Sequence, residues 1–93
     1  MTATDPGHET RRRRAGAMNA LAQLRGDPIM QEAAVELALL ECGRYPHLAP
    51  SMVFRSVAPI IDAHTDRDGT VESDRLAAAL EAELASIAAA DLG

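Results

Sequence analysis

The sequence predicts an all-α fold, a compact bundle or orthogonal array of four short helices. Alanine and leucine, which have the best helix propensities, dominate the apolar composition, whereas aromatic residues make up 2% of the chain. Apolar residues recur at three- and four-residue spacing in several segments, and glycine and proline separate those segments. A chain of 93 residues is the size of one domain. We therefore expect a single helical domain over residues 10–93 behind a disordered tail at residues 1–9.

The first helix is expected from about residue 11 to residue 25. Its apolar stripe consists of Ala17, Met18, Leu21 and Leu24. It begins with a run of four arginines, and positive charges at a helix N-terminus oppose the macrodipole. We therefore expect its first turn to fray, or to be held by an acidic surface elsewhere in the fold.

The boundary to the second helix is marked by Gly26, Asp27 and Pro28. Glycine suits the C-cap of one helix, aspartate the N-cap of the next, and proline its first position. The second helix then runs to about Cys42, and Gly43 ends it. Its apolar residues cover more than one face, which is typical of a helix in the centre of a bundle or of one that a partner covers.

Two further helices follow a connection that contains two prolines. Ser51 is predicted to cap the third helix. Pro59 is predicted to kink or break that helix near residues 56–58, because proline removes a backbone hydrogen bond. Ser73 is predicted to cap the fourth helix. The apolar stripe of that helix consists of Leu76, Leu80, Leu84 and Ile87.

Charge is distributed unevenly along the chain, which has a net charge of −5. Residues 1–26 carry five arginines and two acidic residues, whereas residues 27–93 carry four arginines and twelve acidic residues. The acidic body argues against a general nucleic-acid-binding protein, which normally has a basic face. The arginine run leaves three readings open: a solvated arm, a docking arm for an acidic protein surface, and a phosphate-binding arm for RNA or DNA. Its members are Arg11, Arg12, Arg13 and Arg14.

The chain contains no segment that predicts export or membrane insertion. The residues after the arginine run are too polar for an export signal, and no run approaches eighteen apolar residues. The single cysteine, Cys42, excludes an internal disulfide and is compatible with a reducing compartment. We therefore expect a cytoplasmic protein without a membrane partner.

An acidic loop with an embedded glycine lies at residues 64–76, between the third and fourth predicted helices. Asp66, Asp68, Gly69 and Val71 match the pattern D-x-D-x-D-G-x-[ILV]-x-x-x-E. On these residues, the segment 53–84 resembles a single, degenerate EF-hand, a calcium-binding helix-loop-helix. In that family the glycine permits a sharp turn and the preceding carboxylates bind the ion.

The resemblance implies a calcium site and also limits its affinity. Its ligands would be the carboxylates of Asp66 and Asp68, the carbonyl of Thr70 and the carboxylate of Glu72. Where the family pattern has its first aspartate and its last glutamate, this chain has His64 and Arg75. Imidazole is a poor ligand for Ca²⁺ and a guanidinium repels the ion, so any calcium binding should be weak. The other reading is a structural turn before the fourth helix.

The sequence lacks a recognisable catalytic set. Cys42 and His47 could in principle form a nucleophile and a base, but Cys42 lies at a helix C-terminus, which disfavours a thiolate. No pair of histidines has the spacing of a helical zinc site, and no glycine-rich phosphate loop is present. We therefore expect no enzymatic activity, and no cofactor apart from weakly bound calcium.

The function that these observations favour is that of a small, non-catalytic accessory or regulatory module for protein interactions. It would be a subunit or homo-oligomer of a larger assembly, because the aliphatic residues exceed what one small core can bury. The alternatives are a divalent-cation module that uses the loop and a nucleic-acid-associated protein that uses the arginine run. The predicted partner-binding residues are the four arginines of the run together with Met30, Leu39 and Leu40.

Overall fold

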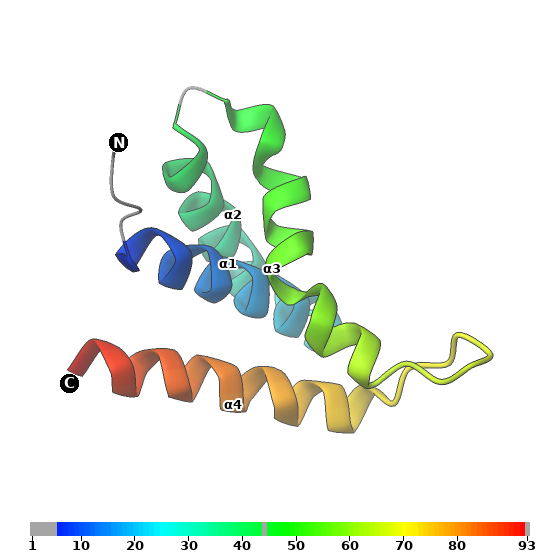
Figure 1. Ribbon diagram of the computed structural model, residues 1–93. Coiled ribbons are helices and arrows are strands. Elements are labelled where there is room, and N and C mark those ends of the chain that lie inside the picture. Colours follow the sequence, from blue (N-terminus) through cyan, green and yellow to red (C-terminus); the bar gives the residue numbers. More distant parts are fainter. Residues whose placement is uncertain (1–5, 44, 93) are drawn as a thin grey trace.

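The computed structural model describes residues 6–43 and 45–92. These residues form an all-α fold, which confirms the predicted fold class, and Figure 1 shows its arrangement. Within the described ranges the only β-type pairing is an isolated antiparallel bridge between Thr65 and Val71. The four helices and one 3₁₀ turn are α1 (Pro6–Arg25), α2 (Pro28–Cys42), η1 (Pro46–Leu48), α3 (Ala49–Ala63) and α4 (Ser73–Leu92).

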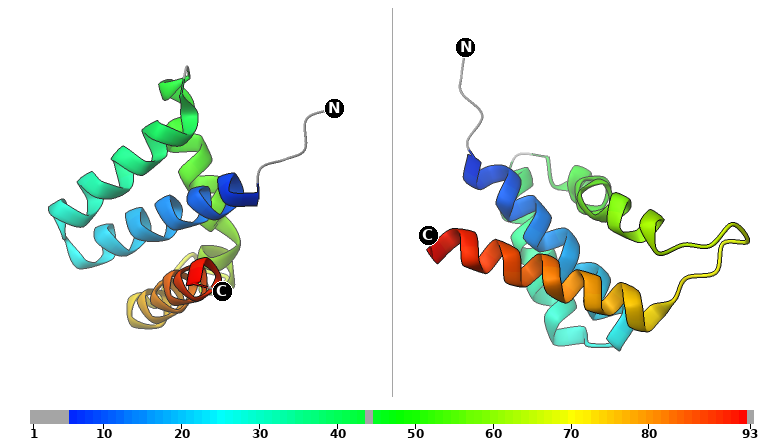
Figure 2. Two further views of the ribbon diagram at one scale, coloured as in Figure 1. Left: turned by 90° about the vertical axis from the view of Figure 1, so that its left-hand side faces the viewer. Right: turned by 60° about the horizontal axis from the view of Figure 1, so that its bottom comes forward.

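Helix α1 is the centre of the fold, because its contacts with the other three helices are the most extensive in the structure. It forms an antiparallel hairpin with α2, and α4 lies alongside it in the opposite direction (Figure 1; Figure 2). Helix α3 crosses α1 steeply and leads through the acidic loop into α4 (Figure 1). None of the described helices is both long and apolar enough to span a membrane.

Helix α1 begins at Pro6, earlier than the sequence predicted. Residues 1–5 of the predicted disordered tail lie outside the described residues, whereas residues 6–9 are helical, so the tail prediction is wrong for that part. Proline is well tolerated in a first helical turn, and Glu9 places an acidic charge near the positive end of the helix. The arginine run therefore follows the first turn instead of forming it.

The predicted boundary between α1 and α2 is confirmed. Gly26 has a positive φ of 62°, and Asp27 has an extended backbone with its carboxylate accepting the N–H of Met30 at 3.1 Å. Pro28 occupies the first turn of α2. At the other end, Gly43 has a φ of 53° and donates its N–H to Leu39 O at 3.1 Å. Local sequence chemistry thus fixes both ends of α2.

Helix α3 differs from the prediction at two positions. It starts at Ala49, directly after η1, so Ser51 lies inside the helix and does not cap it. It also continues through Pro59 and is not broken there. Pro59 and Arg55, whose carbonyl loses its helical partner, are both on the exposed side of α3, where water can bind that carbonyl. The ribbon bends along its length without interruption (Figure 1).

The start of α4 differs by one residue from the prediction. The carbonyl of Glu72 accepts the N–H of Leu76 at 2.9 Å, so Glu72 occupies the N-cap position and Ser73 is the first helical residue. The predicted stripe nevertheless faces the core, since Leu76, Leu80 and Ile87 are buried.

The core consists of two clusters of different composition. The first joins α1, α3 and α4, is rich in leucine, and contains Ala17, Leu21, Val57, Leu76 and Leu80. The second joins α1, α2 and α3 and contains Ala15, Ala38, Ala49 and Val53. Small side chains therefore let α1, α2 and α3 approach closely in the second cluster, whereas interlocking leucines fill the first.

The closest approach is at Gly16, where α1 crosses α3. A Cβ atom at this position would lie 2.8 Å from the carbonyl oxygen of Val53 and closer still to the hydroxyl of Ser56. That hydroxyl donates to the same carbonyl at 2.8 Å, which holds it in place. Glycine is therefore required here for steric reasons.

Candidate functional site

The largest group of exposed aliphatic side chains lies on α2. Ile29 is 80% exposed and Leu40 78%, and Val35 and Leu39 are also exposed. The inward face of the same helix is made of Ala34 and Ala38, the only residues of α2 that are fully buried. Because alanine lets α1 approach closely, α2 packs through Ala34 and Ala38, and the partly buried Met30 and Leu37 add to this contact with the core. Its other large aliphatic residues are exposed.

The exposed residues of α2 form an ordered pattern, here termed the outward face. At 3.6 residues per turn, Glu32 and Glu36 lie one above the other along its middle. Ile29 and Leu40 flank this acidic line on one side, and Val35 and Leu39 flank it on the other. The outward face is therefore two pairs of aliphatic side chains, here termed the apolar rows, separated by two carboxylates. Ile29 lies in the first turn of α2 and Leu40 in the last, about 16 Å apart along the axis.

The predicted partner-binding residues of α2 do not all lie on this face. Leu39 and Leu40 do, whereas Met30 is partly buried and packs against the core cluster that contains Leu21. Ile29 and Val35 were missing from the prediction. The apolar residues of α2 cover most of its circumference, so the sequence pattern did not indicate which face of the helix is buried and which is exposed.

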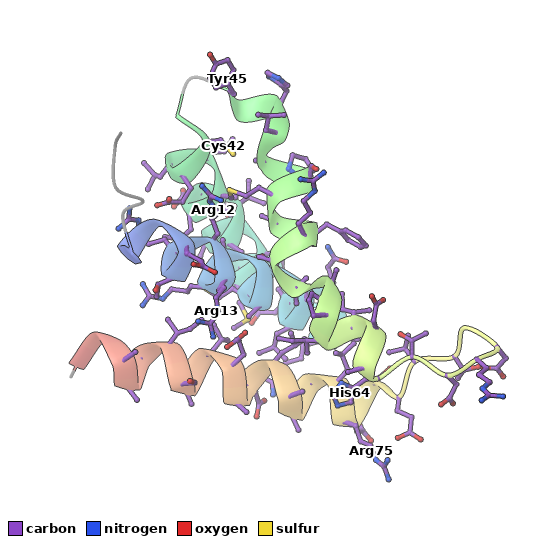
Figure 3. All side chains as sticks on the ribbon, viewed as in Figure 1. Arg12, Arg13, Cys42, Tyr45, His64 and Arg75 are labelled. Carbon is purple, nitrogen blue, oxygen red and sulfur yellow. The ribbon has the colours of Figure 1, made fainter. Side chains whose placement is uncertain are left out.

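The arginine run is divided between different sides of α1. Arg11 pairs with Glu41 of α2 and Arg13 pairs with Glu83 of α4, and Arg14 is also engaged with other residues. The hydrogen bond to Glu83 raises the pKa of Arg13; burial opposes this increase, and the charges of Glu83 and Glu9 add to it. Figure 3 shows Arg12 and Arg13 on opposite sides of α1. Arg11 and Arg13 are therefore held by acidic residues of α2 and α4, which is one of the two outcomes that the sequence predicted for this run.

The acidic loop is a hairpin turn whose polar groups satisfy one another. Asp66 donates its N–H to Thr70 O at 2.8 Å, and Gly69, with a φ of 86°, donates to Asp66 O at 2.9 Å. The carboxylate of Asp68 accepts the N–H of Thr70 at 3.0 Å, which lowers the pKa of Asp68. Glu72 pairs with Arg75 at 3.0 Å. Three of the four predicted calcium ligands, the carbonyl of Thr70 and the carboxylates of Asp68 and Glu72, thus have partners within the chain.

The start of the loop is attached to the end of α3. The hydroxyl of Thr65 donates to Ile61 O at 2.6 Å, and the ring of His64 contacts Ile60 O at 2.9 Å through Nδ1. Among the described residues, no group of three or more histidine, cysteine, aspartate or glutamate side chains is arranged to hold a metal ion. Calcium binding by the loop stays a prediction, and the contacts present are those of a closed turn.

The two residues considered as a nucleophile and a base are not brought together by a contact. Cys42 Sγ lies 3.8 Å from Met52 Sδ. The ring of His47 instead packs edge-on against Tyr45, with 6.1 Å between the ring centroids. Cys42 is thus next to a thioether, which neither accepts its proton effectively nor orients it.

Comparisons with protein-family models, with curated proteins and with solved structures gave no match to this chain. Its function must therefore be argued from its own surfaces.

Proposed function

We propose that the protein is a small, non-catalytic interaction module that docks onto a partner protein through the outward face of α2. The observation that carries this proposal is the orientation of α2. Its alanines face the core, whereas Ile29 and Leu40 are 80% and 78% exposed. Exposed aliphatic residues that are scattered singly are ordinary, but rows on one helix face are typical of an interaction surface. Burial of such rows against a complementary groove or helix would provide the main favourable free energy of binding.

The charge of α2 specifies what kind of partner fits. The helix carries Glu32, Glu36 and Glu41 and contains no basic residue. Glu41 already pairs with Arg11, which leaves the acidic line of Glu32 and Glu36 on the outward face. A partner helix whose leucine-type stripe is accompanied by arginine or lysine would neutralise that line while covering the apolar rows.

A second copy of this chain fits the same surface less well. Two outward faces packed together would bring the carboxylates of Glu32 and Glu36 close to those of the other copy, and like charges in an interface oppose association. The charge pattern therefore favours a basic partner of different sequence over the homo-oligomer that composition alone left open.

A direct test uses a fluorescently labelled amphipathic peptide with a leucine stripe flanked by arginines. Its binding to the full chain is measured by fluorescence anisotropy, and light scattering records the oligomeric state of the protein alone. Leu40→Ser should weaken peptide binding by about tenfold, since a central apolar contact is commonly worth more than 1 kcal/mol. Glu36→Gln should also weaken binding and reduce its salt dependence.

The matched control is Phe54→Ser, which removes a large side chain that is 64% exposed on α3 and not on the outward face. It should leave peptide affinity unchanged. Equal losses from Leu40→Ser and Phe54→Ser would mean that the peptide recognises apolar surface in general, and the proposal would fail. If the protein alone forms a stable dimer, and if Glu36→Gln makes that dimer more stable, then the partner of the outward face is a second copy of the chain and not a basic protein.

A further inference from the structure

A second surface, separate from the outward face of α2, is a pocket of about 610 Å³. It lies where the first half of α1, the end of α2 and the beginning of α3 meet. Figure 3 shows Arg12 extending from α1 toward the end of α2 that carries Cys42. The pocket is lined by Glu9, Arg12, Arg13, Glu41, Cys42, Leu48, Ser51, Met52, Arg55 and Ser56.

Most of the charged groups in this pocket are already matched. Glu41, whose side chain is only 7% exposed, pairs with Arg11. Arg13 pairs with Glu83, and the charge of Glu9 also acts on Arg13. This leaves the guanidinium groups of Arg12 and Arg55 as the cations of the pocket that have no ion pair with any described residue.

Arg12 is the cation of the pocket that lies closest to its buried wall. Its Nε atom is buried and has no hydrogen-bond partner among the described residues, and the same holds for Oε2 of Glu41 on the same wall. Because Nε has no accessible surface, an oxyanion in the pocket would bind the terminal nitrogens of the guanidinium, whose two-pronged donor edge fits carboxylate or phosphate oxygens.

The remaining walls indicate the chemistry of the rest of the ligand. Leu48 and Met52 provide apolar surface, and Ser51 provides a hydroxyl. A ligand with one anionic end and a short apolar body would match both kinds of wall.

We infer that this pocket binds a small organic oxyanion, a carboxylate or a phosphate monoester, whose charged group lies between Arg12 and Arg55 and whose apolar body contacts Leu48 and Met52. This site does not depend on the proposed function of α2, because it uses none of the residues of the outward face. The pocket provides donors and positive charge without a nucleophile or a base in contact with each other, so its role is binding.

The thiol of Cys42 provides the readout, because it is half-buried, lines the pocket and is the only cysteine of the chain. Its rate of alkylation by neutral iodoacetamide is measured with the full chain in hexanoate, in phenyl phosphate and in inorganic phosphate. Sodium chloride at equal ionic strength is the reference. Bound anion should slow the alkylation several-fold and in a saturable manner, and should shift the amide signals of residues 48–56 in NMR spectra.

Arg12→Gln and Arg55→Gln should each weaken this protection by about tenfold, because each removes charge-assisted hydrogen bonds to the anion. Neither arginine has an ion pair with a described residue, so both variants should keep the helical circular-dichroism spectrum. Arg67→Gln, in the acidic loop, is the matched control and should leave the protection intact.

The probes separate the two sources of the anion. Protection by hexanoate alone identifies a carboxylate ligand, and protection by phenyl phosphate or inorganic phosphate identifies a phosphate ligand. If none of the three protects Cys42 at millimolar concentration, or if both arginine variants retain full protection, the inference is overturned. The peptide assay on α2 is unaffected by either result.

Discussion

Helices α1 and α2 lie side by side in one hairpin, yet they use their apolar residues in opposite ways. Helix α1 contacts every other helix and buries Leu21 with 1% of its surface exposed. Helix α2 buries Ala34 and Ala38 and leaves Ile29 and Leu40 in contact with solvent. The difference shows that apolar content does not decide which helix is central. The position of small residues decides it, because they set how closely two helices can approach.

The comparison predicts that the same substitution has very different effects on the two helices. Leu21→Ala should lower the free energy of unfolding by about 3 kcal/mol, because it removes contacts and leaves a cavity in the core. Leu40→Ala should change it by less than about 0.5 kcal/mol, since an exposed side chain loses little. Urea unfolding monitored by circular dichroism measures both values. Similar losses for the two variants would mean that α2 also packs its large residues inward.

Gly16 tests whether close approach to α3 is what makes α1 central. Gly16→Ala should destabilise the protein by about 1–3 kcal/mol, because overpacking exceeds the gain in helix propensity that alanine normally provides. The free energy of unfolding from urea titration is again the measurement.

The control for this position is the double variant Gly16→Ala with Ser56→Ala. It removes the hydroxyl nearest the added methyl group and should recover part of the loss, whereas the contact with Val53 O remains. A stabilising effect of Gly16→Ala alone would show that α1 and α3 do not meet so closely.

Helix α2 should depend on its cap, because only two of its residues, Ala34 and Ala38, are fully buried. Asp27→Ala removes the acceptor for Met30 N–H and should cost about 1 kcal/mol. Asp62→Ala, at an exposed residue near the end of α3, is the control and should cost little. Amide hydrogen exchange should show the loss first in α2. If exchange accelerates equally in α1, then the two helices are one cooperative unit and the contrast between them is smaller than the burial suggests.

The acidic loop lies outside both helices, so a substitution there should have the smallest effect on the free energy of unfolding. Its hydrogen bond to Thr70 N–H lowers the pKa of Asp68 from the ordinary value of 3.8. A lowered carboxyl pKa means that the stabilisation is complete above the unfolded pKa and is lost as the pH falls through the folded one. An NMR titration of the Asp68 carboxyl carbon should therefore give a lower pKa in the folded chain than in urea, and Asp68→Asn should remove the corresponding weak acid sensitivity.

The same loop distinguishes a turn from a cation site. For a turn, thermal unfolding midpoints in EDTA, magnesium and calcium should coincide. A ligand at one hundred times its dissociation constant stabilises by about 2.7 kcal/mol, so a rise specific to calcium would be easily measured. A calcium-specific rise in the midpoint of the unsubstituted protein that Asp68→Asn abolishes would support a cation-binding function. The resemblance to an EF-hand would then extend to function.

Most of the secondary structure could be predicted because its signals are local. Gly26, Asp27 and Pro28 act through backbone conformation and one cap hydrogen bond, and they determine the reversal between α1 and α2 without help from distant residues. Pro59 was misjudged because the cost of proline inside a helix depends on whether the freed carbonyl reaches water, which is a tertiary property.

The candidate sites could be predicted only in part. Leu39 and Leu40 were identified from the apolar excess of α2, but Met30 was grouped with them although it faces the core. The pocket between Arg12 and Arg55 was missed entirely. These two residues are 43 positions apart in the sequence, and no spacing rule connects them.

The sequence by itself determined the helical class, the ends of α2 and the inward stripe of α4, since these depend on propensity, caps and periodicity within a single segment. Only the tertiary structure decided which face of α2 is exposed, which arginines pair with acids, and where α1 and α3 meet at Gly16. Each of these depends on distances between residues far apart in the chain. Such distances are fixed by how closely the helices pack, and not by the order of residues within any one of them.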